Sequence, residues 1–278
     1  MSIYLQILTV FFITIVLHIF YLIIIPKIRK KKLLFESYNT IFIGWLFSFL
    51  LISLIVVFKH YVDNDTMLFN IFIQTFILFV IPTFNFVIKP YLLSIRFSKK
   101  RDLNLEKILE KRNRRIKVYS SEITNAFAMG VTGFGKIIII GNSLKQFLET
   151  KNIEGIILHE YAHHKYKHLH RLYLYTFIVS FLVSSILILA NHYLREYIHP
   201  AMIVGFCGAL YGLFIYYITG FQKKMEYEAD SYAAKEIGSN LYIQTLKKLN
   251  DIKNGSLEKK SITHPLLSER IKNLNGIL

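Results

Sequence analysis

The stretch that decides the fold reads Ile156-Ile157-Leu158-His159-Glu160-Tyr161-Ala162-His163-His164. It contains the pattern His-Glu-x-x-His, as His159, Glu160 and His163. Residues four apart stack on one face of a helix, so both imidazoles can bind a single metal ion. Glu160 follows His159 directly, and its carboxylate can reach a water on that metal. The pattern therefore predicts a helix with two metal ligands and a general base, the alternative being a chance match on a helix rich in His.

Composition places this helix in a membrane protein. Apolar residues make up 53% of the 278 residues, with 23 Phe and 18 Tyr, which is high for a soluble protein. The net charge of +16 would suggest a nucleic-acid partner in a soluble chain. Here the apolar runs make a membrane the better explanation, and no nucleic-acid partner is expected. A single cysteine, Cys207, excludes an internal disulfide and a Cys-based metal cluster, so His and carboxylate must supply the ligands.

Five apolar stretches are long enough to cross a hydrocarbon layer of ~30 Å. They are residues 3–25, 40–58, 67–88, 172–190 and 200–221. Pro82 interrupts the third stretch, which membrane helices tolerate as a kink. The first has no basic segment before it and a basic run after it, so we do not expect a cleaved signal peptide. The fold class predicted is a mainly α, polytopic membrane protein with about five transmembrane helices.

The basic residues predict the orientation of these helices. Of the 34 Lys and Arg, all but Lys59 and Arg195 fall in segments that share one side of the membrane if five spans cross it. By the positive-inside rule this side is the cytoplasm, and the N-terminus lies outside. We interpret the basic run at 111–115 as a face toward anionic lipid headgroups or solvent, not as a nucleic-acid patch.

The predicted topology divides the chain into four parts. Residues 1–88 form an N-terminal transmembrane region of three spans, and residues 172–221 form a transmembrane hairpin of two spans. Residues 89–171 and 222–278 form a cytoplasmic catalytic part, large enough for a small α+β core. Within it we predict a helix at 103–113, strands at 117–120 and 136–140, and a short helix ending at Phe147. Asn152 is expected to cap the helix that carries the motif.

A catalytic zinc needs a third protein ligand, and a candidate follows the last span. The chain there reads Met225-Glu226-Tyr227-Glu228-Ala229-Asp230. Glu226 and Asp230 are four apart and share one face of a predicted helix. Glu226 can bind the metal, while Asp230 can orient a ligand imidazole through its second ring nitrogen. The alternative is a solvated acidic helix start.

In this order, the His-Glu-x-x-His pattern, two spans and Glu-x-Glu-Ala-Asp resemble the membrane-embedded gluzincin zinc metallopeptidases of the HtpX and CAAX prenyl protease type. Residues 124–130, Thr-Asn-Ala-Phe-Ala-Met-Gly, resemble the family's segment before its core strand. Thr263-His264-Pro265 with Ser268-Glu269-Arg270 resembles its C-terminal motif. The resemblance covers about residues 90 to 278. The chain departs from both named types in span count, which is four in HtpX-like proteins and seven in the CAAX protease.

The resemblance implies a zincin-like catalytic part with one Zn²⁺ per chain, in which Glu226 is the third ligand beside His159 and His163. Glu228 is then expected to face elsewhere. His164, His168 and His170 follow the motif on other helix faces, and we interpret them as interfacial or lipid-proximal.

The resemblance also assigns residues around the metal. Asn125, Ala126, Phe127 and Ala128 would form an edge strand that binds an extended peptide through main-chain hydrogen bonds. The alternative is an ordinary hairpin strand. His264 and Arg270 would reach into the site as catalytic groups. The alternatives there are a helix start and a solvated arginine.

These observations predict an integral-membrane zinc endopeptidase that cleaves peptides or membrane proteins at the cytoplasmic membrane face. One alternative is a CAAX-like protease for prenyl peptides. A second is a non-hydrolytic zinc-binding scaffold or transporter, although a transporter should place its polar ligands near the bilayer midplane. The sequence leaves the physiological substrate and the oligomeric state open.

Overall fold

The computed structural model describes residues 12, 76, 80, 83–96, 100–194, 196–259, 261 and 264–276. The chain divides into two compact units, Met1–Ile77 and Leu78–Leu278, and the description below concerns the second. Nearly all of the predicted spans 3–25 and 40–58, and most of 67–88, lie outside the described residues. At the end of the third predicted span, a π-helical turn, η1 (Phe84–Ile88), leads into α4 (Lys89–Arg96).

Three strands form the sheet of the second unit. β1 (Lys117–Ser121), β2 (Ala126–Met129) and β3 (Ile137–Gly141) lie in the order β1-β3-β2. β3 pairs in parallel with β1 and antiparallel with β2, so that Ile139 lies opposite both Tyr119 and Phe127. The strands predicted at 117–120 and 136–140 are confirmed to within one residue. β2 is the edge of this sheet on the side of the metal motif.

The four isoleucines of β3 are buried because helices cover both faces of the strand. Ile138 and Ile140 belong to the main core, together with Leu144 and Leu158. On the other face, Ile137 and Ile139 pack with Tyr119, and Leu93 of α4 contacts this smaller cluster. The chain between β2 and β3 turns at Gly130, whose φ is +84°. A Cβ there would lie 1.9 Å from the Gly135 carbonyl oxygen, so this turn requires glycine.

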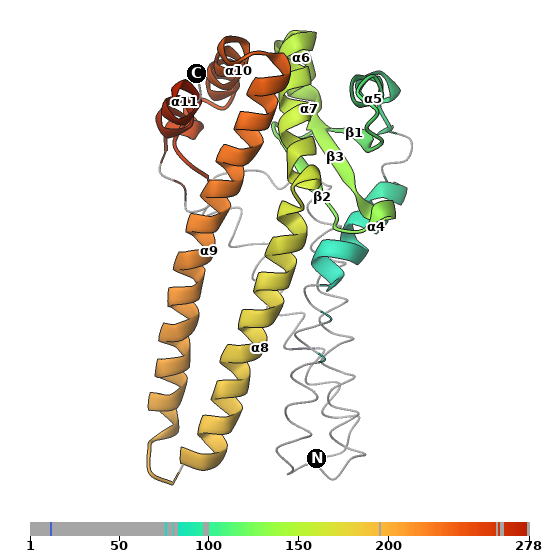
Figure 1. Cartoon of the computed structure of the whole chain (residues 1–278). Coiled ribbons are helices and arrows are strands. Elements are labelled where there is room, and N and C mark those ends of the chain that lie inside the picture. Colours follow the sequence, from blue (N-terminus) through green and yellow to red (C-terminus); the bar gives the residue numbers. More distant parts are fainter. Residues whose placement is uncertain are drawn as a thin grey trace. The chain divides into compact units, whose positions relative to one another are not determined.

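The helices of the head, which we define as residues 100–167 and 222–276, surround this sheet (Figure 1). They are α5 (Leu103–Glu110), α6 (Asn142–Phe147), α7 (Thr150–Lys165), α10 (Ser239–Ile252), α11 (Leu267–Asn275) and the end of α9 (Pro200–Ile237), with short 3₁₀ turns η3 (Gly133–Gly135) and η4 (Ser256–Glu258). α7, which carries the motif, packs between the sheet and α9. Asp102 caps α5 by accepting the Leu105 N–H. The helix ends at Glu110, before the predicted position 113, and Asn113 takes a left-handed φ of +57°.

The predicted cap of α7 is wrong. The helix begins at Thr150 with Glu149 as its N-cap residue, and Asn152 lies inside the first turn. The Asn152 amide is buried and donates to the Thr245 hydroxyl at 2.8 Å. This bond therefore links α7 to α10, and the side chain does not cap the backbone N–H groups at the start of α7.

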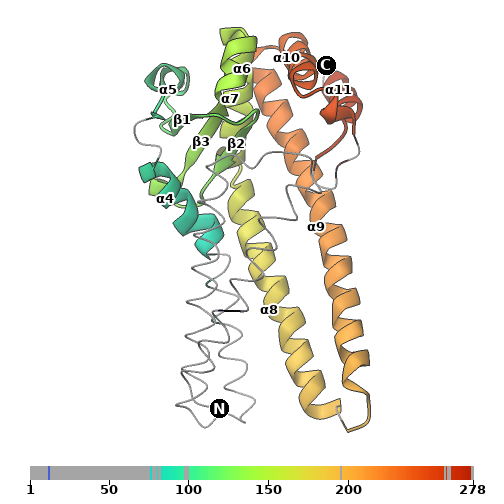
Figure 2. The same cartoon turned by 180° about the vertical axis from the view of Figure 1, so that it is seen from behind.

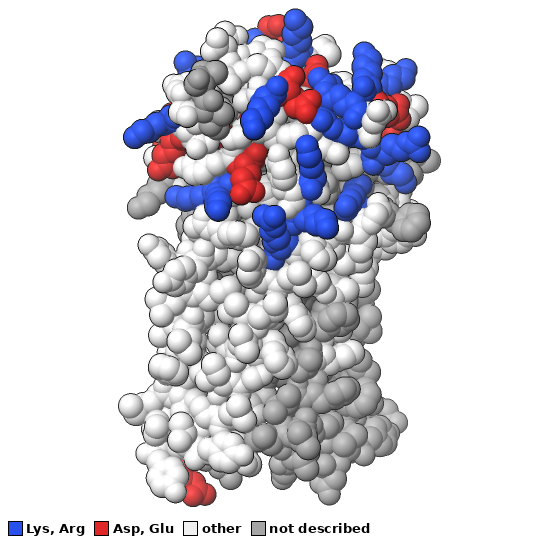
Figure 3. All heavy atoms as spheres, viewed as in Figure 1, with Lys and Arg blue, Asp and Glu red and all other residues white. Residues whose placement is uncertain are grey.

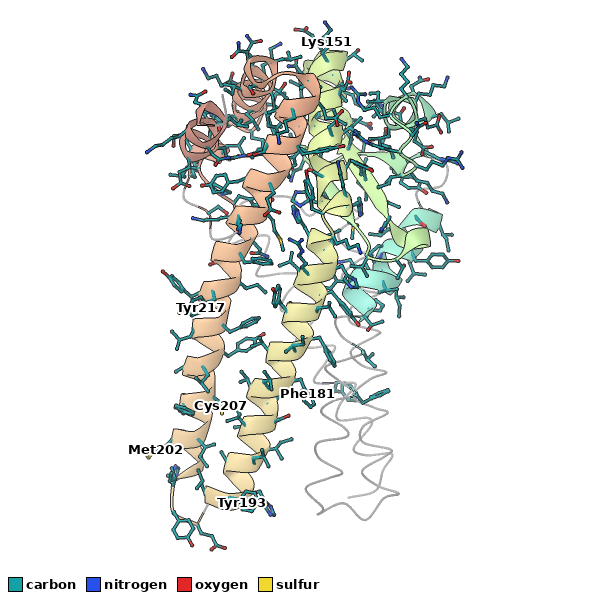
Figure 4. The ribbon with its side chains drawn as sticks, in the orientation of Figure 1. Lys151, Phe181, Tyr193, Met202, Cys207 and Tyr217 are labelled. Atoms are coloured by element: carbon teal, nitrogen blue, oxygen red, sulfur yellow. The ribbon has the colours of Figure 1, made fainter. Side chains whose placement is uncertain are left out.

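Two long helices leave the head side by side, and Figure 2 shows the same pair from behind. α8 (His168–Leu194) and α9 have mean hydropathies of 2.3 and 1.9 over their most apolar windows and are long enough to cross a membrane. The predicted spans 172–190 and 200–221 lie within them. Figure 4 shows Tyr193 and Met202 at the far end of this pair and Lys151 at the opposite end of the unit. Lys and Arg gather over the head in Figure 3, while the α8 and α9 column is almost uncharged on that face.

α9 is one helix of 38 residues. At 1.5 Å per residue it is about 57 Å long. Its first half is the apolar helix of the column, and its second half enters the head and carries Glu226, Glu228 and Asp230. The same helix thus connects the segment that can cross a membrane to the acidic stretch predicted from the sequence.

Candidate metal centre

The structure brings together the three predicted metal ligands. The Nε2 atoms of His159 and His163 are 3.3 Å apart. Oε2 of Glu226 lies 3.5 Å from the first of these nitrogens, and Oε1 of Glu226 lies 3.6 Å from the second. Two donor atoms bound to a tetrahedral zinc at about 2.0–2.1 Å lie roughly 3.3–3.4 Å apart. The spacings found here are close to these values, so the three side chains can bind one metal ion.

His159 is held by a buried carboxylate on the side away from the metal position. Its Nδ1 atom lies 2.9 Å from Oδ1 of Asp230, whose side chain is fully buried. The Tyr242 hydroxyl donates to the same oxygen at 2.8 Å and lies 3.1 Å from His159 Nδ1. Arg270 donates to both oxygens of Asp230, through Nε at 2.7 Å and through Nη2. The predicted contact between Asp230 and His159 is thus present in the structure. Tyr242 and Arg270 also bond to Asp230.

Burial and these partners set opposite pKa shifts on the two histidines. Burial disfavours charge on His159, but hydrogen bonds that its ring donates to Asp230 and Glu226 outweigh it and raise its pKa to about 10. Burial, with the neighbouring His159, lowers the pKa of His163 to about 3. A metal ion at this position would supply the positive charge that the carboxylates favour here.

His163 is held differently, and here the interpretation of His164 and His168 as interfacial or lipid-proximal is wrong, because both are buried in the protein. His168 is not lipid-proximal. It is fully buried, and its Nδ1 lies 3.0 Å from Nδ1 of His163. Its other nitrogen, Nε2, lies 3.0 Å from the carboxylate of Glu228. His164 is also buried, and its Nε2 donates to the Ile137 carbonyl of β3 at 3.1 Å, whereas His170 is exposed.

Glu160 lies beside the metal position at a cavity of about 530 Å³. Burial raises the pKa of its carboxyl, opposed by the charge of His159 and by a backbone hydrogen bond with Ala128 of β2. A carboxylate with a raised pKa is suited to accept a proton near neutral pH. The cavity is also lined by β2 and the residue before it, so the edge strand, the candidate base and the candidate ligands share one space: Asn125, Ala126, Phe127 and Ala128.

The two C-terminal candidates lie at different depths. His264 is 58% exposed, and its Nδ1 lies 3.3 Å from Glu226. Arg270 lines the cavity as well, but it is buried and two of its nitrogens are bonded to Asp230. Its geometry is that of a residue acting through Asp230 and His159.

Three residues at the site had no signal in the sequence: Tyr242, His168 and Lys253. Tyr242 and Lys253 come from α10 and the turn after it, where no motif marks them. Lys253 donates to the Asn125 side chain at 2.6 Å and lines the cavity near Glu160. His168 could have been found only by expecting a break in the helix after the motif.

Three comparisons show which known proteins this chain resembles. The model of Peptidase family M48 matches residues 100–278. A Protease HtpX homolog of Archaeoglobus fulgidus is 28% identical over 96 residues, which are 32% of this chain and 29% of that protein. This chain therefore matches less than a third of that relative's length.

A solved structure, the Ste24p of S. mikatae, has the same fold. It superposes with a TM-score of 0.66 at 16% identity, over 86% of this chain and 65% of that chain. The three comparisons confirm the resemblance to the HtpX and CAAX protease type. Because the family model covers well over half of its residues, the chain belongs to peptidase family M48.

Proposed function

We propose that the protein is an integral-membrane zinc endopeptidase that hydrolyses peptide bonds in peptides or membrane proteins at the cytoplasmic face of the membrane. The observation that carries this proposal is the set of donor distances of 3.3, 3.5 and 3.6 Å among His159, His163 and Glu226. They match a tetrahedral zinc site, and Glu160 lies on the same helix one residue from the first ligand.

The chain's own residues supply the rest of the chemistry. His159, His163 and Glu226 would hold one Zn²⁺, which when bound lowers the pKa of a water and polarises the scissile carbonyl. Glu160 accepts the proton of that water and later passes it to the leaving amine. The edge strand β2 binds the peptide in extended form along the cavity. His264, exposed beside Glu226, is the candidate donor to the oxygen that gains negative charge.

The test of the chemistry compares three variants purified in detergent. Glu160→Gln keeps the shape of the side chain but cannot accept the proton. It should retain stoichiometric zinc and lose cleavage of a model peptide by about 10²–10⁴-fold. Glu226→Ala should lose zinc, whereas Glu228→Ala, on the same helix, removes no ligand and should still bind zinc, with lower affinity.

Two results would overturn the proposal. Equal zinc content in wild type and Glu226→Ala would remove the ligand assignment. Full cleavage by Glu160→Gln would remove the base. Cleavage restricted to a prenylated peptide would instead favour the CAAX-like alternative.

The membrane face is tested with an impermeant thiol reagent in intact cells. The single Cys207 is first replaced by Ser, and one new cysteine is placed at Asn113 or Asn254, both exposed in the head. A cytoplasmic head predicts that these cysteines stay unlabelled, while a cysteine at the exposed Tyr197, between α8 and α9, reacts. Labelling at Asn113 in sealed cells would reverse the proposed orientation.

A further inference from the structure

The second ligand histidine is joined to the surface by two side chains in series. Nδ1 of His163 faces Nδ1 of His168 at 3.0 Å, and Nε2 of His168 faces Glu228 at 3.0 Å. Glu228 is 37% exposed and lies 3.9 Å from Arg171. The series thus begins at the metal position and ends at the edge of the head, where α8 starts.

The hydrogen atoms in this series can be placed by counting donors and acceptors. A histidine that binds a metal through Nε2 must offer its lone pair there, so the proton of His163 is on Nδ1. That N–H needs an acceptor, and Nδ1 of His168 is the facing atom. The proton of His168 is then on Nε2, where the Glu228 carboxylate accepts it. Every donor has one acceptor, and only one arrangement satisfies all three side chains.

The backbone is bent in a way that makes this contact possible. His168 follows His163 by five residues, which on a continuous helix would point it about 140° away. The chain instead leaves α7 after Lys165 and begins α8 at His168. Between them Lys167 takes a φ of +57°, a left-handed conformation that non-glycine residues rarely adopt. An unfavourable backbone conformation that brings one buried side chain onto a ligand points to a role for that side chain.

We propose that His168 and Glu228 are positioning residues that fix the tautomer and the ring orientation of His163 for metal binding. The inference rests on the proposed function, because it takes His163 as a ligand. In this arrangement α9 carries the carboxylates that support both histidines of α7, His159 and His163. Glu226 completes the ligand set, and Glu228, two residues on, supports His163 through His168.

Two substitutions of His168 distinguish a packing role from a positioning role, because the two roles predict opposite orders of zinc affinity. His168→Asn keeps an acceptor oxygen close to the place of Nδ1 but leaves unfilled volume. His168→Leu fills more of the volume but offers His163 no acceptor. If His168 positions the ligand, zinc affinity falls in the order wild type, Asn, Leu. If it only fills space, Leu binds zinc at least as well as Asn.

The experiment measures zinc affinity by chelator competition on the full-length protein in detergent, with thermal unfolding of the zinc-free forms beside it. We expect His168→Leu to bind zinc about 10–100-fold more weakly, as for other partners of ligand histidines, and His168→Asn to lose less. Glu228→Gln can still accept through its amide oxygen and should lose least. The visible spectrum of the Co²⁺-loaded protein should change in His168→Leu.

The matched control is His164→Leu. His164 is the neighbouring buried histidine and bonds to the sheet, so its loss should lower the unfolding temperature and leave zinc affinity and the Co²⁺ spectrum unchanged. Unchanged zinc affinity in His168→Leu, or an Asn variant no better than the Leu variant, would overturn the inference. If His168→Leu does not fold, unchanged affinity in both His168→Asn and Glu228→Gln would overturn it. Equal zinc binding by wild type and His163→Ala would instead refute the metal site itself.

Discussion

The two histidines proposed as metal ligands lie one helical turn apart, yet they are supported in opposite ways. His159 bonds directly to Asp230, a fully buried carboxylate that also holds Tyr242 and Arg270. His163 reaches its carboxylate only through His168, and Glu228 is partly exposed. The first arrangement, which we call the inner support, joins the metal site to the core. The second, the outer support, joins it to the start of α8. Loss of the inner support should therefore damage folding and metal binding together, and loss of the outer support mainly metal binding.

The largest effect should follow removal of the inner carboxylate. Asp230→Ala leaves the buried Arg270 guanidinium without its partner and removes the acceptor of His159. Breaking a buried ion pair in this way typically costs about 3–5 kcal/mol. We expect a large drop in unfolding temperature and loss of zinc, measured by calorimetry and metal analysis in detergent.

The comparison variant for this prediction is Glu228→Ala. Glu228 is 37% exposed, so water can replace it, and the loss in stability should stay below about 1 kcal/mol. Equal destabilisation by the two variants would show that the two supports do not differ in their coupling to the core.

A smaller effect should follow loss of the Tyr242 hydroxyl. Tyr242→Phe keeps the ring in its packing but removes one donor to the charged Asp230. Hydrogen bonds to charged groups contribute about 1.5–3 kcal/mol. We expect a lower unfolding temperature together with weaker zinc binding, because the inner support links both. Tyr161→Phe, whose ring contact with Arg114 is kept, is the control. A Tyr242→Phe protein with normal zinc affinity would place the hydroxyl outside the support of His159.

The smallest effect, and one independent of the metal, is expected at Asp102. Burial would raise the pKa of its carboxyl, but bonds from Lys145 and the Leu105 N–H outweigh this and lower it. A lowered pKa adds stability above the unfolded value of about 3.9, and this is lost as the pH falls through the folded pKa. Asp102→Asn keeps a capping oxygen but loses the charge that attracts Lys145, so it should be less stable by about 0.2–1 kcal/mol at neutral pH, and the difference should vanish in acid. Unfolding temperatures measured across this pH range, with zinc affinity unchanged throughout, would check it.

The contact between His159 and Asp230 in the inner support could be predicted from the sequence because regular helix geometry determines it. His159 and His163 share a face of α7, and Glu226 and Asp230 share a face of α9, since both pairs are four residues apart. The run of isoleucines likewise predicts the central strand. These features depend on the spacing of residues along a helix or strand, and this spacing can be read directly from the sequence.

The outer support could not be predicted in this way, because it depends on a break in periodicity. Lys167 carries no turn signal such as Gly or Asn, yet the chain takes a left-handed conformation there and returns His168 to His163. The prediction that Asn152 caps α7 was wrong for a related reason. Its amide was expected to serve its own helix end, but a tertiary partner, Thr245, takes it. The contacts that such polar side chains make depend on partners that are distant in the sequence.

Because α9 is long and uninterrupted, a small tilt of the helix at one end displaces residues at its other end. About 39 Å of helix separates Pro200 from Glu226 at 1.5 Å per residue. A tilt of about 2° around its far end would move the Glu226 carboxylate by roughly 1.4 Å on this length. Displacements of about 1 Å at a reacting centre can cost roughly a hundredfold in rate. Helices that cross a bilayer tilt to match its thickness. If the protein is the peptidase proposed above, its turnover should therefore depend on the chain length of the lipids around it, although the proposed site lies in the head.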